Sequence, residues 1–214
     1  MDITSLRRNI ERQVHTNSSA FVPDILNSGF SCTRCGWCCS RNFEIKITEK
    51  ISRPSNAISI FPTDIRHIIK NTGLMWDEVA QPDIYSCFSN DDKILVIGWI
   101  LRRNEEETCV FFKNGGCTIY SCRPMICRCY PFFMGKGGIE IMYCNGLGKV
   151  ADNENTSEIG LALKRYEIKK LQSYIRIIEQ VGDKLIYNNL RALPDNYSGE
   201  VLVMDGETIS KRRL

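Results

Sequence analysis

Four of the 11 cysteines in this chain lie within eight residues, as Cys32-Thr-Arg-Cys35-Gly-Trp-Cys38-Cys39. Chance scatter of a small buried side chain would rarely produce C-x2-C-x2-C-C, whereas metal sites commonly use such spacing. A second group fills residues 109–144, and Cys87 stands apart from both groups. The second group comprises Cys109, Cys117, Cys122, Cys127, Cys129 and Cys144. Because 11 is odd, disulfides cannot pair all the cysteines, and we expect thiolate metal ligation instead.

Composition and charge narrow the classes of protein further. Of the 214 residues, 43% are hydrophobic and 25% are charged, which is typical of a globular domain. The net charge of +3 is too small and too scattered to indicate a nucleic-acid partner. The longest apolar run, Ile94 to Leu101, is far shorter than a membrane span, and the N-terminus lacks an apolar export signal. We therefore expect a cytoplasmic chain with reduced cysteines and no membrane contact.

The apolar periodicity predicts an α+β fold in which a small cysteine-rich domain has helical flanks. Helical spacing of apolar residues predicts an N-terminal helix within residues 1–20 and a long helix from Thr156 to about Val181. Residues 21–31 are predicted to be a connection. A short helix is expected from Phe61 to Asn71 with Thr63 as its N-cap, and another around residues 76–80.

Short strands are predicted between these helices. Alternation predicts a strand at residues 43–48, and residues 93–102 resemble a single strand. Glycine-rich turns predict hairpins within residues 109–120 and 132–143, and one further strand is expected at residues 200–204. The predicted division is a helical arm at 1–27, the metal-binding domain at 28–150, and a C-terminal helix and tail at 151–214.

The first cysteine group has two chemical interpretations. Cys32, Cys35 and Cys38 match the C-x2-C-x2-C run that wraps one side of an iron-sulfur cubane, with a fourth ligand from a distant cysteine. Cys39 is predicted to serve a different metal from Cys38, or none, because neighbouring side chains diverge. Zinc is the alternative, since a C-x2-C pair with two distant thiolates makes a four-cysteine tetrahedron.

Further motif residues carry a resemblance to a known family. The first cysteine group is followed much later by Cys109-Val-Phe-Phe-Lys-Asn-Gly-Gly-Cys117, then Arg123-Pro124-x2-Cys127-Arg128-x-Tyr130-Pro131 and Cys144-x-Gly146. Together these blocks resemble the YkgJ-type CxxCxxCC cysteine-cluster family over about residues 28–150. Proteins of that family are described as zinc- or iron-chelating, and often as containing iron-sulfur clusters.

The resemblance implies which cysteines bind metal. Its pattern selects eight, enough for two four-thiolate sites: Cys32, Cys35, Cys38, Cys39, Cys109, Cys117, Cys127 and Cys144. The extra cysteines, Cys87, Cys122 and Cys129, are either packing thiols or replacement ligands. We expect Arg123 and Arg128 to offset the negative charge of the cofactor, the alternative being ordinary surface arginines.

The functional expectation is an iron-sulfur protein with two 4Fe-4S clusters as cofactors, the alternative being one cluster. It would act in electron transfer, with a redox or protein partner, or in cluster-dependent modification of another molecule. The alternatives are a zinc-binding structural or interaction protein and a metal-handling chaperone. No nucleotide loop, catalytic triad or C-x3-C-x2-C motif accompanies the cysteines, so catalytic residues and a reaction are not assigned from the sequence.

Overall fold

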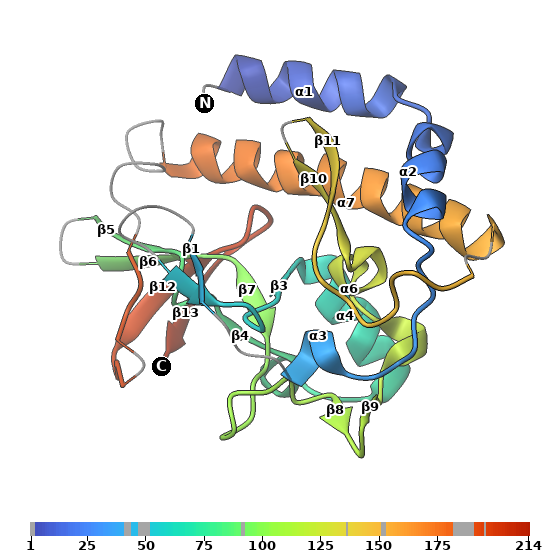
Figure 1. Cartoon of the computed structure of the whole chain (residues 1–214). Coiled ribbons are helices and arrows are strands. Elements are labelled where there is room, and N and C mark those ends of the chain that lie inside the picture. Colours follow the sequence, from blue (N-terminus) through green and yellow to red (C-terminus); the bar gives the residue numbers. More distant parts are fainter. Residues whose placement is uncertain are drawn as a thin grey trace.

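The structure of the chain is a computed structural model that describes residues 3–40, 44–46, 52–90, 93–135, 137–150, 153–181, 191–194 and 196–214. These residues form the predicted α+β fold, with an N-terminal helix, a long C-terminal helix and several small sheets (Figure 1). Within them, no helix is long and apolar enough to cross a membrane.

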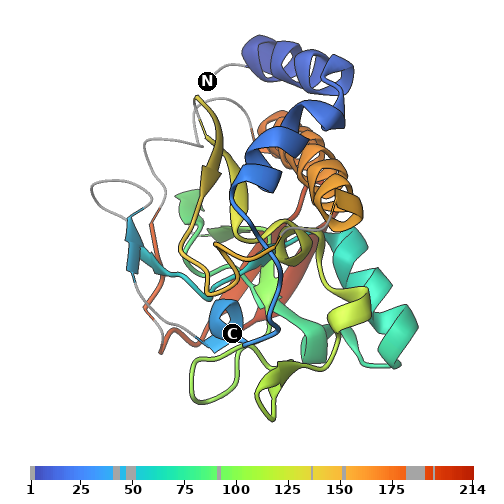
Figure 2. The same ribbon diagram turned by 45° about the vertical axis from the view of Figure 1, so that its right-hand side comes forward.

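Two amphipathic helices lie side by side at one edge of the molecule (Figures 1 and 2). They are α1 (Ile3–His15) and α7 (Asn153–Val181), both close to the predicted bounds. Leu6 of α1 is buried against Ile175 and Ile178 of α7. The N-terminal helix is therefore held by apolar burial, which is the main source of helix stability in proteins.

The segment predicted to be a connection contains a helix, so that expectation was wrong. After a 3-10 turn, η1 (Ser18–Phe21), the chain forms α2 (Val22–Asn27). Pro23 lies in its first turn, where backbone N–H groups need no partner within the helix. Ile25 is buried among Phe21, Phe30 and Ile159, so tertiary packing stabilises a helix too short to be seen as a pattern.

Helix α4 (Pro62–Thr72) forms where the sequence predicted a helix, but its N-cap was predicted wrongly. The N-cap is Phe61, and Thr63 lies inside the first turn. The carboxylate of Asp64 accepts the Phe61 N–H at 3.2 Å, which replaces the cap that Thr63 was expected to supply. The helix ends at Gly73, whose φ of 74° is the left-handed conformation usual at this position. The predicted helix that follows is α5 (Trp76–Val79).

The largest sheet joins the middle of the chain to its C-terminal segment. Its strand order is β13-β12-β6-β5, with β5 (Cys87–Asn90), β6 (Lys93–Ile97), β12 (Glu200–Met204) and β13 (Ile209–Arg213). The predicted strand β12 runs parallel to β6, and the other pairs are antiparallel. The C-terminal segment thus supplies an inner strand of the sheet.

The single strand predicted at residues 93–102 is two strands, so that expectation was also wrong. Gly98, with φ of 84°, separates β6 from β7 (Trp99–Leu101). A residue with a β-carbon adopts this conformation only with strain, and the turn moves the chain into a second sheet. That sheet has the order β3-β7-β4, with β3 (Ser59–Ile60) and β4 (Ala80–Pro82) as its edges.

Three hairpins complete the described strands. The predicted turns at residues 114–115 and 135–138 join β8 (Phe112–Lys113) to β9 (Gly116–Cys117), and β10 (Phe132–Gly135) to β11 (Gly138–Ile141). The strand predicted at residues 43–48 is β1 (Glu44–Lys46), which pairs with β2 (Ser52–Pro54); its other residues lie outside the described part.

The division into three segments stays a prediction, although the segments are closely packed. Helix α7 packs against α6 (Met125–Cys129) of the cysteine-rich segment, and β12 pairs with β6 of the same segment. The main core gathers Ile65, Val96, Trp99, Phe111 and Val203 from helices and both larger sheets. This core supports the segments that carry the cysteines.

Candidate metal centre

A one-turn helix presents the adjacent cysteines of the first group. Helix α3 (Trp37–Ser40) begins after Gly36, whose φ is 70° and whose carbonyl accepts the Cys39 N–H at 2.8 Å. There is no room for a β-carbon at Gly36, because it would stand 1.8 Å from the Phe112 ring. Cys38 is half-buried and Cys39 is buried, and their Sγ atoms lie 3.8 Å apart.

Two regions of backbone pairing bring the distant cysteines to the first group. Residues 28–31 and 146–149 are joined by three backbone hydrogen bonds of 2.6 to 3.1 Å, which places Cys32 near Cys144. At the other side of α3, the Cys109 N–H donates to the Cys39 carbonyl at 3.1 Å. The start of the first group therefore lies beside Cys144, and the end of the first group lies beside Cys109.

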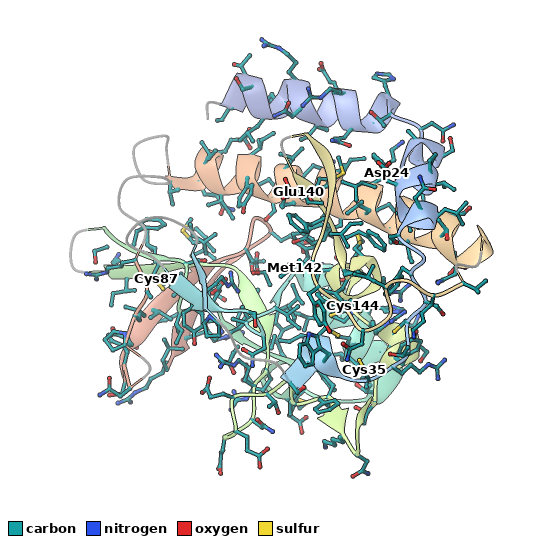
Figure 3. All side chains as sticks on the ribbon, in the orientation of Figure 1. Asp24, Cys35, Cys87, Glu140, Met142 and Cys144 are labelled. Atoms are coloured by element: carbon teal, nitrogen blue, oxygen red, sulfur yellow. The ribbon has the colours of Figure 1, made fainter. Side chains whose placement is uncertain are left out.

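The eight cysteines selected by the family resemblance line one cavity of about 80 Å³. The cavity lies between α3, the β8–β9 hairpin, α6 and the segment after β11. In Figure 3, Cys35 and Cys144 lie at this end of the molecule and Cys87 lies far away in the sheet region. Burial differs within the set: Cys32 and Cys35 are exposed, whereas Cys39 and Cys109 are 8% and 3% exposed.

The other three cysteines are buried and do not line this cavity. Cys87 and Cys122 belong to the main core, and the Cys87 thiol donates to the Ile84 carbonyl at 3.2 Å. Cys129 lies two residues after Cys127 in α6, on the opposite face of the helix, and packs with Phe30 and Phe132. Burial raises the pKa of both Cys87 and Cys129 to about 12, as expected of packing thiols.

Electrostatic coupling links the eight thiols through Cys38 and Cys39. The Cys144 thiol interacts with Cys32, Cys35 and Cys38, and the Cys39 thiol interacts with Cys109 and Cys117. The Cys127 thiol interacts with Cys38, Cys39 and Cys117. Because Cys38 and Cys39 also interact with each other, coupling alone does not divide the eight thiols into two sites.

The thiols hold their protons firmly in this arrangement. Hydrogen bonding to Cys109 raises the pKa of Cys39 to about 12, and a hydrogen bond to Cys39 raises that of Cys38 further. Burial raises the pKa of Cys127 well above the usual value, and raises those of Cys117 and Cys144. Closely spaced thiols repel each other as thiolates, so a bound cation would reverse these shifts.

Arg123 lines the cavity and stacks on Tyr120, with Cζ 3.7 Å from the ring centroid. Its Nε is buried and has no hydrogen-bond partner among the described residues. Arg34 also stacks on Tyr120, at 4.2 Å. The predicted Arg128 lines the cavity too, but its guanidinium donates to the carbonyls of Arg123 and Ser121, at 3.0 and 3.4 Å. Arg123 therefore has a free donor toward the thiols, and Arg128 fixes the backbone that carries it.

The residues fit a thiophilic metal by donor chemistry and by their position around one cavity. Among the described residues, no three histidine, cysteine or carboxylate side chains lie close enough together to hold a metal ion. Thiolate donors select zinc, copper(I) or iron-sulfur clusters. Metal binding therefore requires the thiols to move together, and ligation by the eight cysteines stays a prediction.

The fold and the converging thiols define a small α+β protein with a candidate thiolate metal centre. Comparison with family models assigns it: residues 31–157, more than half the chain, match CxxCxxCC, described as "Putative zinc- or iron-chelating domain". The chain belongs to this family, as the resemblance indicated, and its domain is metal-binding, with zinc or iron as the metal. Neither the curated proteins nor the solved structures compared with the chain gave a match.

Proposed function

We propose that the protein binds two iron-sulfur clusters, each held by four thiolates, and that it acts in electron transfer or in cluster-dependent modification of another molecule. The observation that carries the proposal is the separation of the 11 cysteines. Eight line one cavity from distant parts of the chain, and three are buried elsewhere.

We assign the eight cysteines to two sites from the backbone pairing, supported by the interactions of the Cys144 and Cys39 thiols with their neighbours. One site uses Cys32, Cys35, Cys38 and Cys144, and the other uses Cys39, Cys109, Cys117 and Cys127. This assignment places Cys38 and Cys39 in different sites. The first site takes three ligands from the C-x2-C-x2-C run and the fourth from a distant cysteine, as a cubane requires.

Each cluster would supply one-electron chemistry when bound. Because Cys32 and Cys35 are exposed, the proposed first site would lie at the surface, where a redox partner could approach; because Cys39 and Cys109 are buried, the proposed second site would be buried. The unpaired Nε–H of Arg123 is a donor for a negatively charged cluster, and such hydrogen bonds tune the reduction potential. The proposed partner is a protein or small redox carrier, because a net charge of +3 gives little attraction for nucleic acid.

Zinc is a second candidate that one distance favours. The Cys38 and Cys39 sulfurs are 3.8 Å apart. A tetrahedron with Zn–S bonds of about 2.3 Å has edges of about 3.8 Å, so these two thiolates would fit one zinc ion without moving apart. The zinc alternative therefore places Cys38 and Cys39 in one site, in a structural or interaction protein or a metal-handling chaperone.

Anaerobic metal and sulfide analysis separates these candidates. Two 4Fe-4S clusters predict about eight irons and eight acid-labile sulfides per chain, with broad visible absorption and an EPR signal on reduction. A colourless protein that holds stoichiometric zinc after anaerobic iron reconstitution would overturn the cluster proposal.

Two cysteines on α6 provide a matched pair of variants. Cys127→Ala should remove about half of the iron, since Cys127 lines the cavity, whereas Cys129→Ala should leave the iron content unchanged. Cys144→Ala should remove the other half. Equal iron in the Cys127→Ala and Cys129→Ala proteins would contradict the proposed ligand set.

A further inference from the structure

A second, larger cavity of about 250 Å³ adjoins the thiol-lined cavity. The two cavities share five residues in their walls: Trp37, Cys38, Ile58, Cys127 and Tyr130. The remaining wall comes from β2 and the turn after it, from β3, α6 and α7, and from the start of the β10–β11 hairpin with the Met142 that follows it, which Figure 3 labels. Four residues of the family pattern lie in its wall, but the proposed metal sites use only the two thiols and do not explain its aromatic and aliphatic lining.

The walls of the second cavity are mostly aromatic and aliphatic. Trp37, Tyr130, Phe132, Phe133 and Tyr166 all contribute to its lining. Phe133 is 38% exposed, so the cavity reaches the surface beside this ring. Ring faces arranged in this way favour a flat aromatic occupant, which stacks with them or meets their edges.

Three polar side chains that line this cavity, those of Arg53, Ser59 and Tyr130, are engaged with the protein itself. Arg53 pairs with the buried Asp83 at 3.2 Å and also donates to the Ala57 carbonyl. Ser59 donates to the same carboxylate at 3.5 Å, and the Tyr130 hydroxyl donates to the Tyr143 carbonyl at 2.6 Å. A charged ligand would lose its hydration without gaining a counter-ion from these groups, so the site favours an uncharged one.

The volume sets the size of the ligand. An engineered apolar cavity of about 150 Å³ binds benzene, and the present cavity is about 1.7 times as large. We propose that it binds an uncharged aromatic molecule of two fused rings, which lies against the Cys38 and Cys127 side chains. Binding of the ring goes beyond the proposed function and does not depend on it; only contact between the ring and a bound metal rests on the metal centre.

Equilibrium dialysis of the anaerobically purified protein against 2-naphthol tests the proposal. We expect saturable binding of one molecule per chain, and binding of naphthalene-2-sulfonate that is at least about tenfold weaker, since burying an unpaired anion is costly. Absence of saturable 2-naphthol binding would overturn the inference. Equal binding of the charged probe would overturn the proposed ligand class.

Two variants locate the bound ring. Ala57 is buried and lines the cavity, so Ala57→Phe should fill it and abolish binding. Phe133→Ala should weaken binding by about two- to tenfold through loss of ring contact. Ile141→Ala is the matched control, because Ile141 lies in the same hairpin, is 44% exposed and does not line the cavity.

Measuring the folding and the metal content of each variant separates loss of ligand binding from loss of structure or of metal. If Ala57→Phe does not fold, the comparison of Phe133→Ala with Ile141→Ala decides, since both side chains are exposed. Equal affinities in that pair would place the ring on another surface and refute the proposal. Normal metal content with lost 2-naphthol binding separates this cavity from the metal sites, and 2-naphthol binding by a metal-free chain would support the cavity even if the proposed function fails.

Discussion

Replacement of Gly36 by alanine should damage the metal centre through two separable effects. Gly36 has φ of 70°, and its added β-carbon would stand 1.8 Å from Phe112 Cε2. The left-handed conformation costs a residue with a β-carbon about 1 to 2 kcal/mol. Ordinary carbon contact is about 3.5 to 4.0 Å, so the ring must also withdraw by about 2 Å.

A shift of Phe112 would displace two cavity cysteines. The Phe112 N–H donates to the Cys109 carbonyl at 2.9 Å, and Phe112 pairs with Cys117 across the β8–β9 hairpin. Because Phe112 packs against the main core, we take the cost of overpacking as about 1 to 3 kcal/mol. The total loss of stability for Gly36→Ala is then about 2 to 5 kcal/mol, with reduced metal content.

Gly73→Ala isolates the conformational part of this cost. Gly73 has nearly the same φ, 74°, but a β-carbon there meets nothing within 4 Å. Urea denaturation of metal-free chains should show that Gly73→Ala loses only about 1 to 2 kcal/mol. In a double-mutant cycle, Phe112→Ala should relieve the Gly36→Ala clash by about 1 to 3 kcal/mol. Equal losses for the two glycine variants, or no coupling to Phe112, would refute this reasoning.

Three further predictions concern α6, pH and metal removal. The Asp64 carboxylate accepts hydrogen bonds from the N–H groups of Phe61 and Met125, at 3.2 and 3.1 Å. Asp64→Ala should therefore lower the free energy of unfolding by about 1 to 3 kcal/mol. Urea denaturation measures this loss, and an unchanged midpoint would contradict the role of Asp64. Burial raises the pKa of the Cys127 thiol, and a metal binds the thiolate, so apparent metal affinity should rise with pH, by up to about tenfold per unit for each proton released. Competition titrations at two pH values check this, and an affinity that falls with rising pH would contradict it. Chelation should lower the thermal midpoint, because metal that binds only the folded chain stabilises it; an unchanged midpoint after complete metal loss would show that the sites form without coupling to folding.

Much of the secondary structure could be predicted because it depends on local patterns. The spacing of isoleucines predicts α4, and the Asn-Gly-Gly turn predicts the β8–β9 hairpin. The errors arise where distant contacts decide. Asp64 caps α4 while also binding the start of α6, and Gly98 divides a continuous apolar run between two sheets. Strand β13 was not predicted, because it is a charged edge strand whose side chains are only partly buried.

The sequence could predict which cysteines line the candidate site, but not how they are arranged in space. The family resemblance separated the eight cysteines that line the cavity from the three that do not. It could not assign the eight to two proposed sites, because that assignment rests on the pairing of residues 28–31 with 146–149. The aromatic cavity could not be predicted from the sequence either, since Ala57, Phe133 and Tyr166 come from distant segments that share no sequence pattern.

The position of β12 has a consequence for synthesis of the chain. All eight cavity cysteines precede residue 145, whereas the strand that pairs with β6 begins at Glu200. A ribosome therefore releases every thiol before it has made an inner strand of the sheet behind them. Because domains generally complete folding as units, the thiols are exposed in an unfinished fold while β12 is still being made. Metal delivered during translation would find Cys39 and Cys109 accessible. Metal delivered to the finished protein would find these two cysteines buried.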